Sequence, residues 1–368
     1  MDLIFEGLTS FTPGHGLMMM VAGALIYLGI AKKYEPLLLL PIGFGALLAN
    51  IPLSVATGPE GWLTRIYEIG ILSELFPILL FIGIGAMMDF GPLLSRPITV
   101  FYGAAAQIGI FITVMLSLAF GFSLNESVSI GIIGAADGPT SIYVSAKLAP
   151  HYLSAISVAA YSYMALVPLI QPPIIRAFTT PEERRIRAPI AGKRAPRIVR
   201  ILFPIVVTIL AGIVTPVSTE LIGALMFGNL IRESGVTERL SMSAQNELSN
   251  LVTLLLGVTI GSTMSADAFL RSDTLMILGI GLVAFALDTA GGVLFARFLN
   301  LFLKTKINPM IGAAGISAFP MSARVVHRVG LEEDPTNFLL MQAAGANVAG
   351  QLGSVVAGSV LLTLVLGG

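Results

Sequence analysis

The chain has 368 residues, of which 55% are hydrophobic and only 11% are charged, whereas a soluble domain has about 25% charged residues. Its net charge is zero, with no large basic surface to indicate nucleic-acid binding, and the absence of cysteine excludes disulfides, thiolate metal sites and a cysteine nucleophile. Apolar runs recur from end to end at close to the roughly 20 residues that cross a bilayer. The sequence therefore predicts an all-α polytopic membrane protein.

The first half, residues 1–177, is predicted to form one membrane repeat. Its apolar runs give five expected crossings, at 16–31, 36–54, 70–88, 98–121 and 153–177. A further apolar segment, 127–148, is interrupted by Asp137, Gly138-Pro139 and two hydroxyl residues. Because proline removes a backbone donor and clashes with the preceding turn, we expect this segment to be a broken, re-entrant hairpin with freed carbonyl groups.

Residues 178–199 form the one long polar linker. The stretch RAFTTPEERRIRAPIAGKRAPRIVR, which contains it, has eight basic and two acidic residues. Since positive charge is enriched in cytoplasmic loops, we expect the linker to lie in the cytoplasm. It is either a solvated loop that sets the topology or a docking site for a soluble partner subunit.

The second half, residues 200–368, is predicted to form the second membrane repeat. Crossings are expected at 200–216, 219–231, 247–264, 274–300 and 338–366, of which 219–231 is short for a crossing. Segment 307–326 is apolar but interrupted by glycine, proline and polar residues. It is the expected counterpart of the first hairpin.

Three stretches of the first half have an echo in the second. GALLAN (45–50) resembles GALMFGN (223–229), IGAMM (84–88) resembles IGSTM (260–264), and IGAADGPTSIYVSAK (133–147) resembles IGAAGISAFPMSAR (311–324). All three pairs share an offset of about 180 residues, as a duplicated unit would give. With five crossings and a re-entrant hairpin in each half, the repeats must be inverted, with the N-terminus outside, as in many transporters.

Asp137 is the first candidate functional residue, because a carboxylate within a membrane segment costs about 2.5–3.5 kcal/mol. The freed carbonyls, the carboxylate and the hydroxyls of Thr140 and Ser141 form a set of hard oxygens that suits a sodium ion. The alternative is a structural kink in which Asp137 caps a helix or pairs with an arginine.

The second hairpin carries its own polar residues, Asn308, Ser317, Ser322 and Arg324. Arg324 is a fixed cation that can hold an anionic carboxyl group. It can equally be an interfacial arginine whose head reaches toward water.

Other polar residues interrupt apolar runs elsewhere in the chain. Tyr163 can give a proton or a hydrogen bond, although an isolated membrane tyrosine more often packs or anchors at the interface. Asn347 lies among small residues that allow close approach. Asp288 is as costly as Asp137, and the sequence indicates no partner for it.

GAADGPTSIY, NPMIGAAGISAFPMSARVV and NFLLMQAAGANVAGQ closely resemble the β subunit of the sodium-pumping biotin-dependent decarboxylases, which act on oxaloacetate, glutaconyl-CoA or methylmalonyl-CoA. The resemblance covers essentially the whole chain. It implies that the β subunit decarboxylates carboxybiotin with consumption of a proton and couples this step to sodium export. Its cofactors would be a sodium ion and carboxybiotin delivered by a carrier.

The resemblance also implies roles for single residues. Asp137 matches the family's essential membrane aspartate. The implied catalytic residues are Asp137, Tyr163 and Arg324, and the last two are also the implied carboxybiotin-binding residues. The implied sodium site comprises Asp137 with Asn308, Gly312, Ser317 and Asn347. Implied partners are a carboxyltransferase α subunit, a biotin carrier protein, a small membrane γ/δ subunit and further β copies, with a trimer favoured, in a bacterial or archaeal cytoplasmic membrane.

Two other functions fit parts of this pattern. Inverted repeats and a midplane aspartate are also expected of a stand-alone sodium-coupled carboxylate carrier or sodium/proton antiporter, which would act without partner subunits. A purely structural membrane anchor would have no need of intramembrane Asp, Asn and Arg. The chain has no P-loop pattern, so the energy must come from an ion gradient or from a reaction shared with other subunits.

Overall fold

The computed structural model describes residues 2–187 and 195–367, which form helices and turns without any β-strand. Within this part of the chain, six helices are long and apolar enough to cross a membrane, or seven if the bent pair Val55–Leu72 and Leu75–Met87 counts as one span. The predicted all-α membrane fold is confirmed. Residues 188–194 of the expected linker lie outside the described residues.

The first half contains eleven α-helices in the described chain. They are α1 (Asp2–Thr9), α2 (Pro13–Ala31), α3 (Pro36–Ala49), α4 (Trp62–Ile66), α5 (Leu75–Met87), α6 (Gly91–Ser95), α7 (Thr99–Ala106), α8 (Ile108–Ala119), α9 (Leu124–Gly131), α10 (Gly138–Leu148) and α11 (Leu153–Ala177). A 3-10 turn, η3 (Ile132–Ala135), joins α9 to α10.

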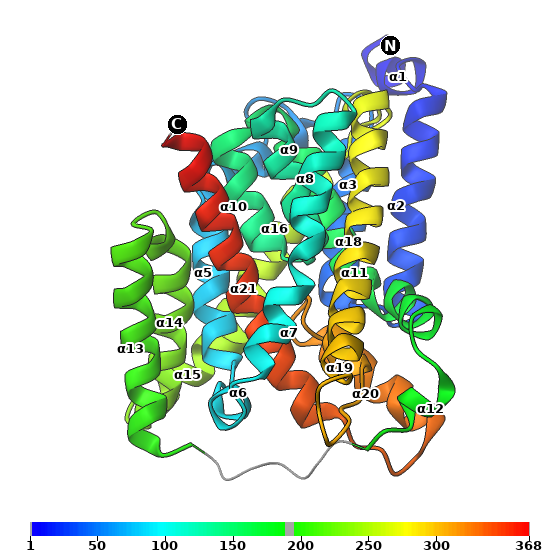
Figure 1. Ribbon diagram of the computed structural model, residues 1–368. Coiled ribbons are helices and arrows are strands. Elements are labelled where there is room, and N and C mark those ends of the chain that lie inside the picture. Colours follow the sequence, from blue (N-terminus) through cyan, green and yellow to red (C-terminus); the bar gives the residue numbers. More distant parts are fainter. Residues whose placement is uncertain (1, 188–194, 368) are drawn as a thin grey trace.

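The second half continues with ten more in the described residues. They are α12 (Pro181–Arg184), α13 (Arg197–Val214), α14 (Ser218–Ser234), α15 (Glu238–Ser243), α16 (Ser249–Ser262), α17 (Ala266–Phe269), α18 (Ser272–Leu299), α19 (Met310–Ala313), α20 (Met321–Glu333) and α21 (Leu340–Leu366). Figure 1 shows both termini toward one end of the molecule and α12 and α6 at the opposite end.

Each expected crossing contains a helix, but several differ from a simple span. The helices α3, α14 and α16 have 14, 17 and 14 residues, fewer than the roughly 20 that cross a bilayer. The expected crossing 98–121 is divided at Gln107 into α7 and α8. Both hairpin segments are broken, as predicted.

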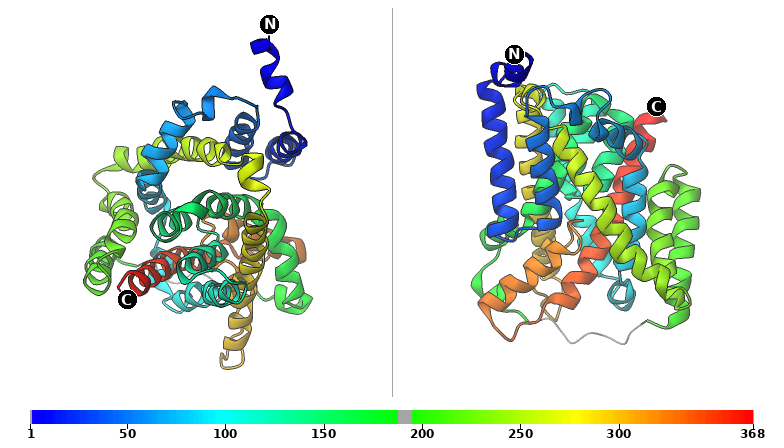
Figure 2. Two further views of the ribbon diagram at one scale, coloured as in Figure 1. Left: turned by 90° about the horizontal axis from the view of Figure 1, so that it is seen from above. Right: turned by 180° about the vertical axis from the view of Figure 1, so that it is seen from behind.

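The helices fall into two groups. An outer group of α2, α3, α5, α13, α14 and α16 forms an arc beside an inner group that contains both broken hairpins (Figure 2, left). Within the outer group α3 packs on α16 and α14 packs on α5, whereas α18 and α21 organise the inner group by packing on α7, α8, α11 and both hairpins.

Glycines set the close crossings of the outer group. A Cβ on Gly45 of α3 would collide with the carbonyl of Val258 in α16, and one on Gly228 of α14 would collide with that of Ile82 in α5. Small residues of this kind let two membrane helices approach until their backbones touch. The helix pairs α3–α16 and α5–α14 therefore meet backbone to backbone.

Two of the similar stretches of each half contact the other half reciprocally: GALLAN of the first half contacts IGSTM of the second, and GALMFGN of the second contacts IGAMM of the first. Asn50 ends GALLAN and donates from Nδ2 to the carbonyl of Met264, 2.7 Å away, at the end of IGSTM. Asn229 ends GALMFGN and donates in the same way to Met88, 2.9 Å away, at the end of IGAMM. Two units related by a two-fold axis would exchange contacts in this manner. The inverted relation and the boundaries 1–177, 178–199 and 200–368 remain predictions, which this exchange supports.

Substitution of Gly228 tests the close crossing of α14 and α5. Gly228→Ala places a methyl group against the Ile82 carbonyl, and overpacking of this kind typically costs about 1–3 kcal/mol. We expect a lower melting temperature for the detergent-solubilised chain.

Gly223→Ala is the matched control on the same helix, because nothing lies within 4 Å of a Cβ at that position. It should leave the melting temperature unchanged or raise it, since alanine is the better helix former. Equal effects of the two substitutions would contradict the proposed packing.

Candidate functional site

The first hairpin breaks at a left-handed residue immediately before Asp137. Ala136 has φ 51° and ψ 40°, a conformation that is uncommon for residues with a Cβ and that collects at functional sites. Asp137 then caps α10, with its side chain accepting from the N–H of Thr140. The structural alternative considered for Asp137, a helix cap, is therefore part of its role.

The predicted effect of Pro139 was wrong. Pro139 lies in the first turn of α10, where its missing N–H would have no intrahelical partner anyway. The chain is broken by η3 and by Ala136 instead. The carbonyl that does become available is that of Ala135, and it accepts from the N–H of Ser317 at 2.9 Å.

The second hairpin meets the first at this point. The segment between α19 and α20 contains a cis Phe319–Pro320 peptide bond, and its Ser317 reaches both the first hairpin and α21, where its hydroxyl donates to the carbonyl of Gly350 at 2.9 Å. Asn347 of α21 donates to the carbonyl of Ile316 at 2.7 Å. Ser317 and Asn347 thus lie in one hydrogen-bonded network with the residues that flank Asp137.

Gln107 ties the same network to the break between α7 and α8. Its amide nitrogen lies 3.0 Å from the carbonyl oxygen of Gly103, 3.3 Å from that of Gly315 and 3.4 Å from that of Gly350. One buried amide therefore serves a carbonyl of α7, one of the second hairpin and one of α21.

The carboxylate of Asp137 is buried among neutral donors. Its Oδ2 accepts from the Thr140 hydroxyl at 2.7 Å, the Gln351 amide at 2.7 Å and the Ser354 hydroxyl at 2.6 Å. Its Oδ1 accepts from the Thr140 N–H at 3.1 Å. In the described chain no ion pair involves Asp137. The site thus holds a carboxylate with hydrogen bonds but without a protein cation.

The sequence reasoning missed Gln351 and Ser354. A signal was present, since Asn347, Gln351 and Ser354 follow one another at helical spacing within an otherwise apolar and small-residue helix. All three are buried. Residues at this spacing share one face, and that face of α21 is directed toward the two hairpins.

Tyr163 lies away from the Asp137 network. Its hydroxyl donates to the backbone carbonyl of Leu278 in α18, and its ring packs near Gly281. The tyrosine beside Asp137 is instead Tyr161, whose ring lies against Gly138. The structure therefore does not bring the expected catalytic tyrosine to the expected aspartate.

Asn308 and Gly312 occupy the entry of the second hairpin. The amide of Asn308 donates to the carbonyls of Arg184 and Ile186, both at 2.8 Å, and its oxygen accepts from the N–H of Met310. Gly312 allows α19 to touch the backbone of α18 at Gly292. Neither residue is directed at Asp137, so in this conformation both position the hairpin.

Arg324 is exposed on α20. Burial raises the pKa of the nearby Glu35 carboxyl, in the turn between α2 and α3, and the positive charge of Arg324 opposes that rise. Arg324 therefore faces the turn between α2 and α3, across the boundary between the inner and outer groups. It does not contact Asp137 by any hydrogen bond or ion pair.

Asp288 is fully buried in α18 at the break between α7 and α8. Its two carboxyl oxygens have no hydrogen-bond partner among the described residues, and a Cβ at Gly109 would lie 2.3 Å from its Oδ1. A Cβ at Gly134 would lie 2.6 Å from its Oδ2. Gly109 and Gly134 thus make room for this carboxyl. Gly134 lies three residues before Asp137 in the first hairpin.

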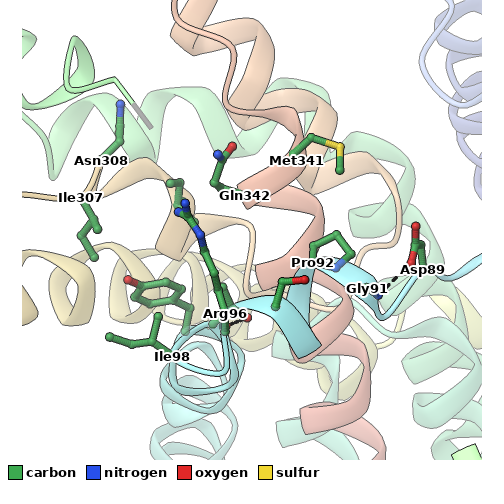
Figure 3. A pocket seen from close by; sticks show the side chains of 14 residues that line it. Asp89, Gly91, Pro92, Arg96, Ile98, Ile307, Asn308, Met341 and Gln342 are labelled. Atoms are coloured by element: carbon green, nitrogen blue, oxygen red, sulfur yellow. Dashed lines mark hydrogen bonds between the residues drawn. The ribbon is translucent and has the colours of Figure 1, made fainter. Parts of the chain in front are cut away.

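A separate cavity of about 420 Å³ opens between α6, α7 and the starts of α19 and α21. Its polar lining includes Arg96, Thr99, Tyr102, Asn308 and Gln342. Figure 3 shows the side chain of Arg96 extending toward Gln342. The helix α6, which lines the cavity, lies at the same end of the molecule as α12 (Figure 1). None of the lining residues is among the hydrogen-bond donors of Asp137.

A buried carboxylate between two interrupted helices is a pattern typical of membrane proteins that move ions. The family model described as the Na⁺-transporting oxaloacetate decarboxylase beta subunit matches residues 14–365. The chain therefore belongs to this family and is a membrane subunit of a decarboxylase.

Relatives over nearly the full length carry three different substrate names. The methylmalonyl-CoA decarboxylase subunit beta of Veillonella parvula is 51% identical, over 98% of this chain and 95% of its own. The glutaconyl-CoA decarboxylase subunit beta of Acidaminococcus fermentans is 50% identical, over 98% and 96%. The oxaloacetate decarboxylase beta chain 2 of Salmonella typhi is 47% identical, over 98% and 97%.

Substitution of Gln107 tests the network that holds the two hairpins together. Gln107→Leu keeps the approximate side-chain volume but deprives buried carbonyls of their donor, a loss of about 1–3 kcal/mol. The melting temperature of the solubilised chain should fall accordingly. Gln245→Leu is the control, because it removes only a hydrogen bond to Ser241, which lies four residues earlier in the chain. It should change the free energy of unfolding by less than about 0.5 kcal/mol.

Proposed function

We propose that this β subunit decarboxylates carboxybiotin presented by partner subunits and couples the reaction to sodium export. The family membership supports this function, and the observation that carries the sodium part is the Asp137 carboxylate. It is 2% exposed and surrounded by neutral donors at the junction of the two hairpins. A carboxylate buried this deeply, without a positively charged side chain beside it, is suited to bind a mobile cation.

The donors around Asp137 are suited to exchange for a cation. The hydroxyls of Thr140 and Ser354 have lone pairs that face a cation once their hydrogens turn away, and the Gln351 amide presents its oxygen after a half-turn. Carboxylate, hydroxyl and amide oxygens are ligands of hard cations. Sodium binding would therefore replace three hydrogen bonds with oxygen contacts and neutralise the carboxylate.

Decarboxylation needs an anion site and a proton source. Loss of CO₂ from carboxybiotin leaves the electron pair on a ureido nitrogen, which takes up one proton to give biotin. Arg324 is the proposed partner of the carboxylate, since a guanidinium binds it through two parallel N–H groups. Tyr163 is the proposed proton donor, a role that requires its hydroxyl to leave the Leu278 carbonyl.

The remaining assignments concern the assembly. We propose a carboxyltransferase α subunit, a biotin carrier protein and a small membrane γ/δ subunit as partners, with three β copies in the complex, in a bacterial or archaeal cytoplasmic membrane. The carboxybiotin would approach from the end of the molecule at which α12 lies (Figure 1), where Arg184 and Arg187 pair with Glu333 and Asp334 at the end of α20. The acid or acyl-CoA consumed is chosen by the α subunit.

Asp137→Asn tests the sodium site. The amide side chain is nearly isosteric but carries no charge, so we expect the complex to assemble while sodium-dependent decarboxylation and sodium uptake into proteoliposomes are lost. Asp267→Asn, on an exposed residue, should leave both activities intact. Continued pumping by Asp137→Asn would contradict the assignment. Sodium uptake by the purified β chain without its partners would instead favour a stand-alone transporter.

Arg324→Gln tests the anion site. Removing a charged partner of a carboxylate typically costs about 2–5 kcal/mol of binding, so the carboxybiotin concentration for half-maximal decarboxylation should rise by at least tenfold. Arg328→Gln, one turn along α20 with its guanidinium bound to the Pro168 carbonyl, is the matched control. If Arg96→Gln had the larger effect, the carboxybiotin would bind in the cavity of Figure 3 instead.

A further inference from the structure

Tyr161 has an unexplained hydroxyl group. The residue lies on α11 and is 1% exposed, and its hydroxyl has no hydrogen-bond partner among the described residues. Buried polar groups are bonded in the great majority of cases, and an unbonded one is destabilising. A fully enclosed phenol without a partner therefore needs either a ligand or a second conformation of its surroundings.

The position of Tyr161 points to a ligand. The atoms of its ring that lie against Gly138 are Cε2 and Cζ, the carbon that carries the hydroxyl. Gly138 directly follows Asp137, so the ring of Tyr161 packs on the backbone next to the residue that carries the carboxylate. A side chain at position 138 would prevent the Tyr161 ring from packing here, because its Cβ would overlap the ring.

The phenol does not bond to Asp137, whose hydrogen bonds come from other groups. Oδ2 accepts three hydrogen bonds and Oδ1 accepts the N–H of Thr140. The phenol oxygen is thus a spare acceptor beside a buried negative charge, and the ligand it fits is a small cation.

We propose that Tyr161 supplies a ligand oxygen to a sodium ion bound at Asp137, together with Thr140, Gln351 and Ser354. This assignment rests on the proposed sodium function of Asp137 and adds residues to it. The hydroxyls of Thr140 and Ser354 turn their lone pairs to the ion, the Gln351 amide rotates, and the Tyr161 oxygen gains its first partner. Tyr163, two residues further along α11, is bound to α18 through Leu278 and takes no part in this cage.

Tyr161→Phe separates a ligand from a packing residue, because it removes only the oxygen. The full chain is purified in detergent in a potassium background, and its melting temperature is followed as sodium is added. Without sodium, Tyr161→Phe should melt at the same temperature as the wild type or higher, since an unbonded buried hydroxyl is lost. The sodium concentration for half of the stabilisation should rise about tenfold, as for the loss of one bond to a charged group.

Two comparisons decide the outcome. Tyr27→Phe removes an exposed phenol on α2 and should leave the sodium titration unchanged. In the assembled complex, the sodium concentration for half-maximal decarboxylation should shift by the same factor with Tyr161→Phe. An unshifted titration, or a lower melting temperature without sodium, would overturn the role of Tyr161. A wild-type chain that sodium does not stabilise would instead overturn the sodium site at Asp137.

Discussion

The burial of one carboxylate within a membrane protein constrains the rest of this structure. Asp137 is placed where an ionised group is costly, and only hydrogen bonds compensate it in the described chain. A continuous helix offers no free N–H at its centre. The helical backbone of the first hairpin therefore ends before Ala136, which is left-handed, and α10 begins after Asp137. The N-terminus of α10 and the hydroxyls of Thr140 and Ser354 then surround the Asp137 carboxylate.

The broken hairpins then depend on the helices that enclose them. Backbone groups exposed by a break must find partners inside the protein. Here the Ala135 carbonyl accepts a hydrogen bond from the N–H of Ser317. The second hairpin is bonded in turn to α21 through the Ser317 hydroxyl and to Gln107 through the Gly315 carbonyl. Such exchange requires backbones in close contact, which the glycines at helix crossings provide. The high glycine content is thus a consequence of holding polar, non-helical backbone at the centre of a membrane protein.

The sequence predicted the parts of the fold that follow from hydrophobicity and helix breakers. Long apolar runs located the helices, the interruptions within 127–148 and 307–326 were predicted, and Ser317 and Asn347 lie in one hydrogen-bonded network. The division of 98–121 at Gln107 could not be foreseen, because glutamine does not break helices and its amide bonds to carbonyls distant in sequence. Tyr161 and Tyr163 are two residues apart on one helix, and only the packing of α11 shows which of them faces Asp137.

The most direct test is a structure of the complex with saturating sodium, compared with one in a sodium-free potassium buffer. We predict a cation within about 2.5 Å of Asp137, in the range of hard-cation oxygen contacts, with the Gln351 amide rotated and the Tyr161 hydroxyl directed toward the ion. A sodium-bound structure in which Gln351 still donates to Asp137 and the ion lies elsewhere would contradict it.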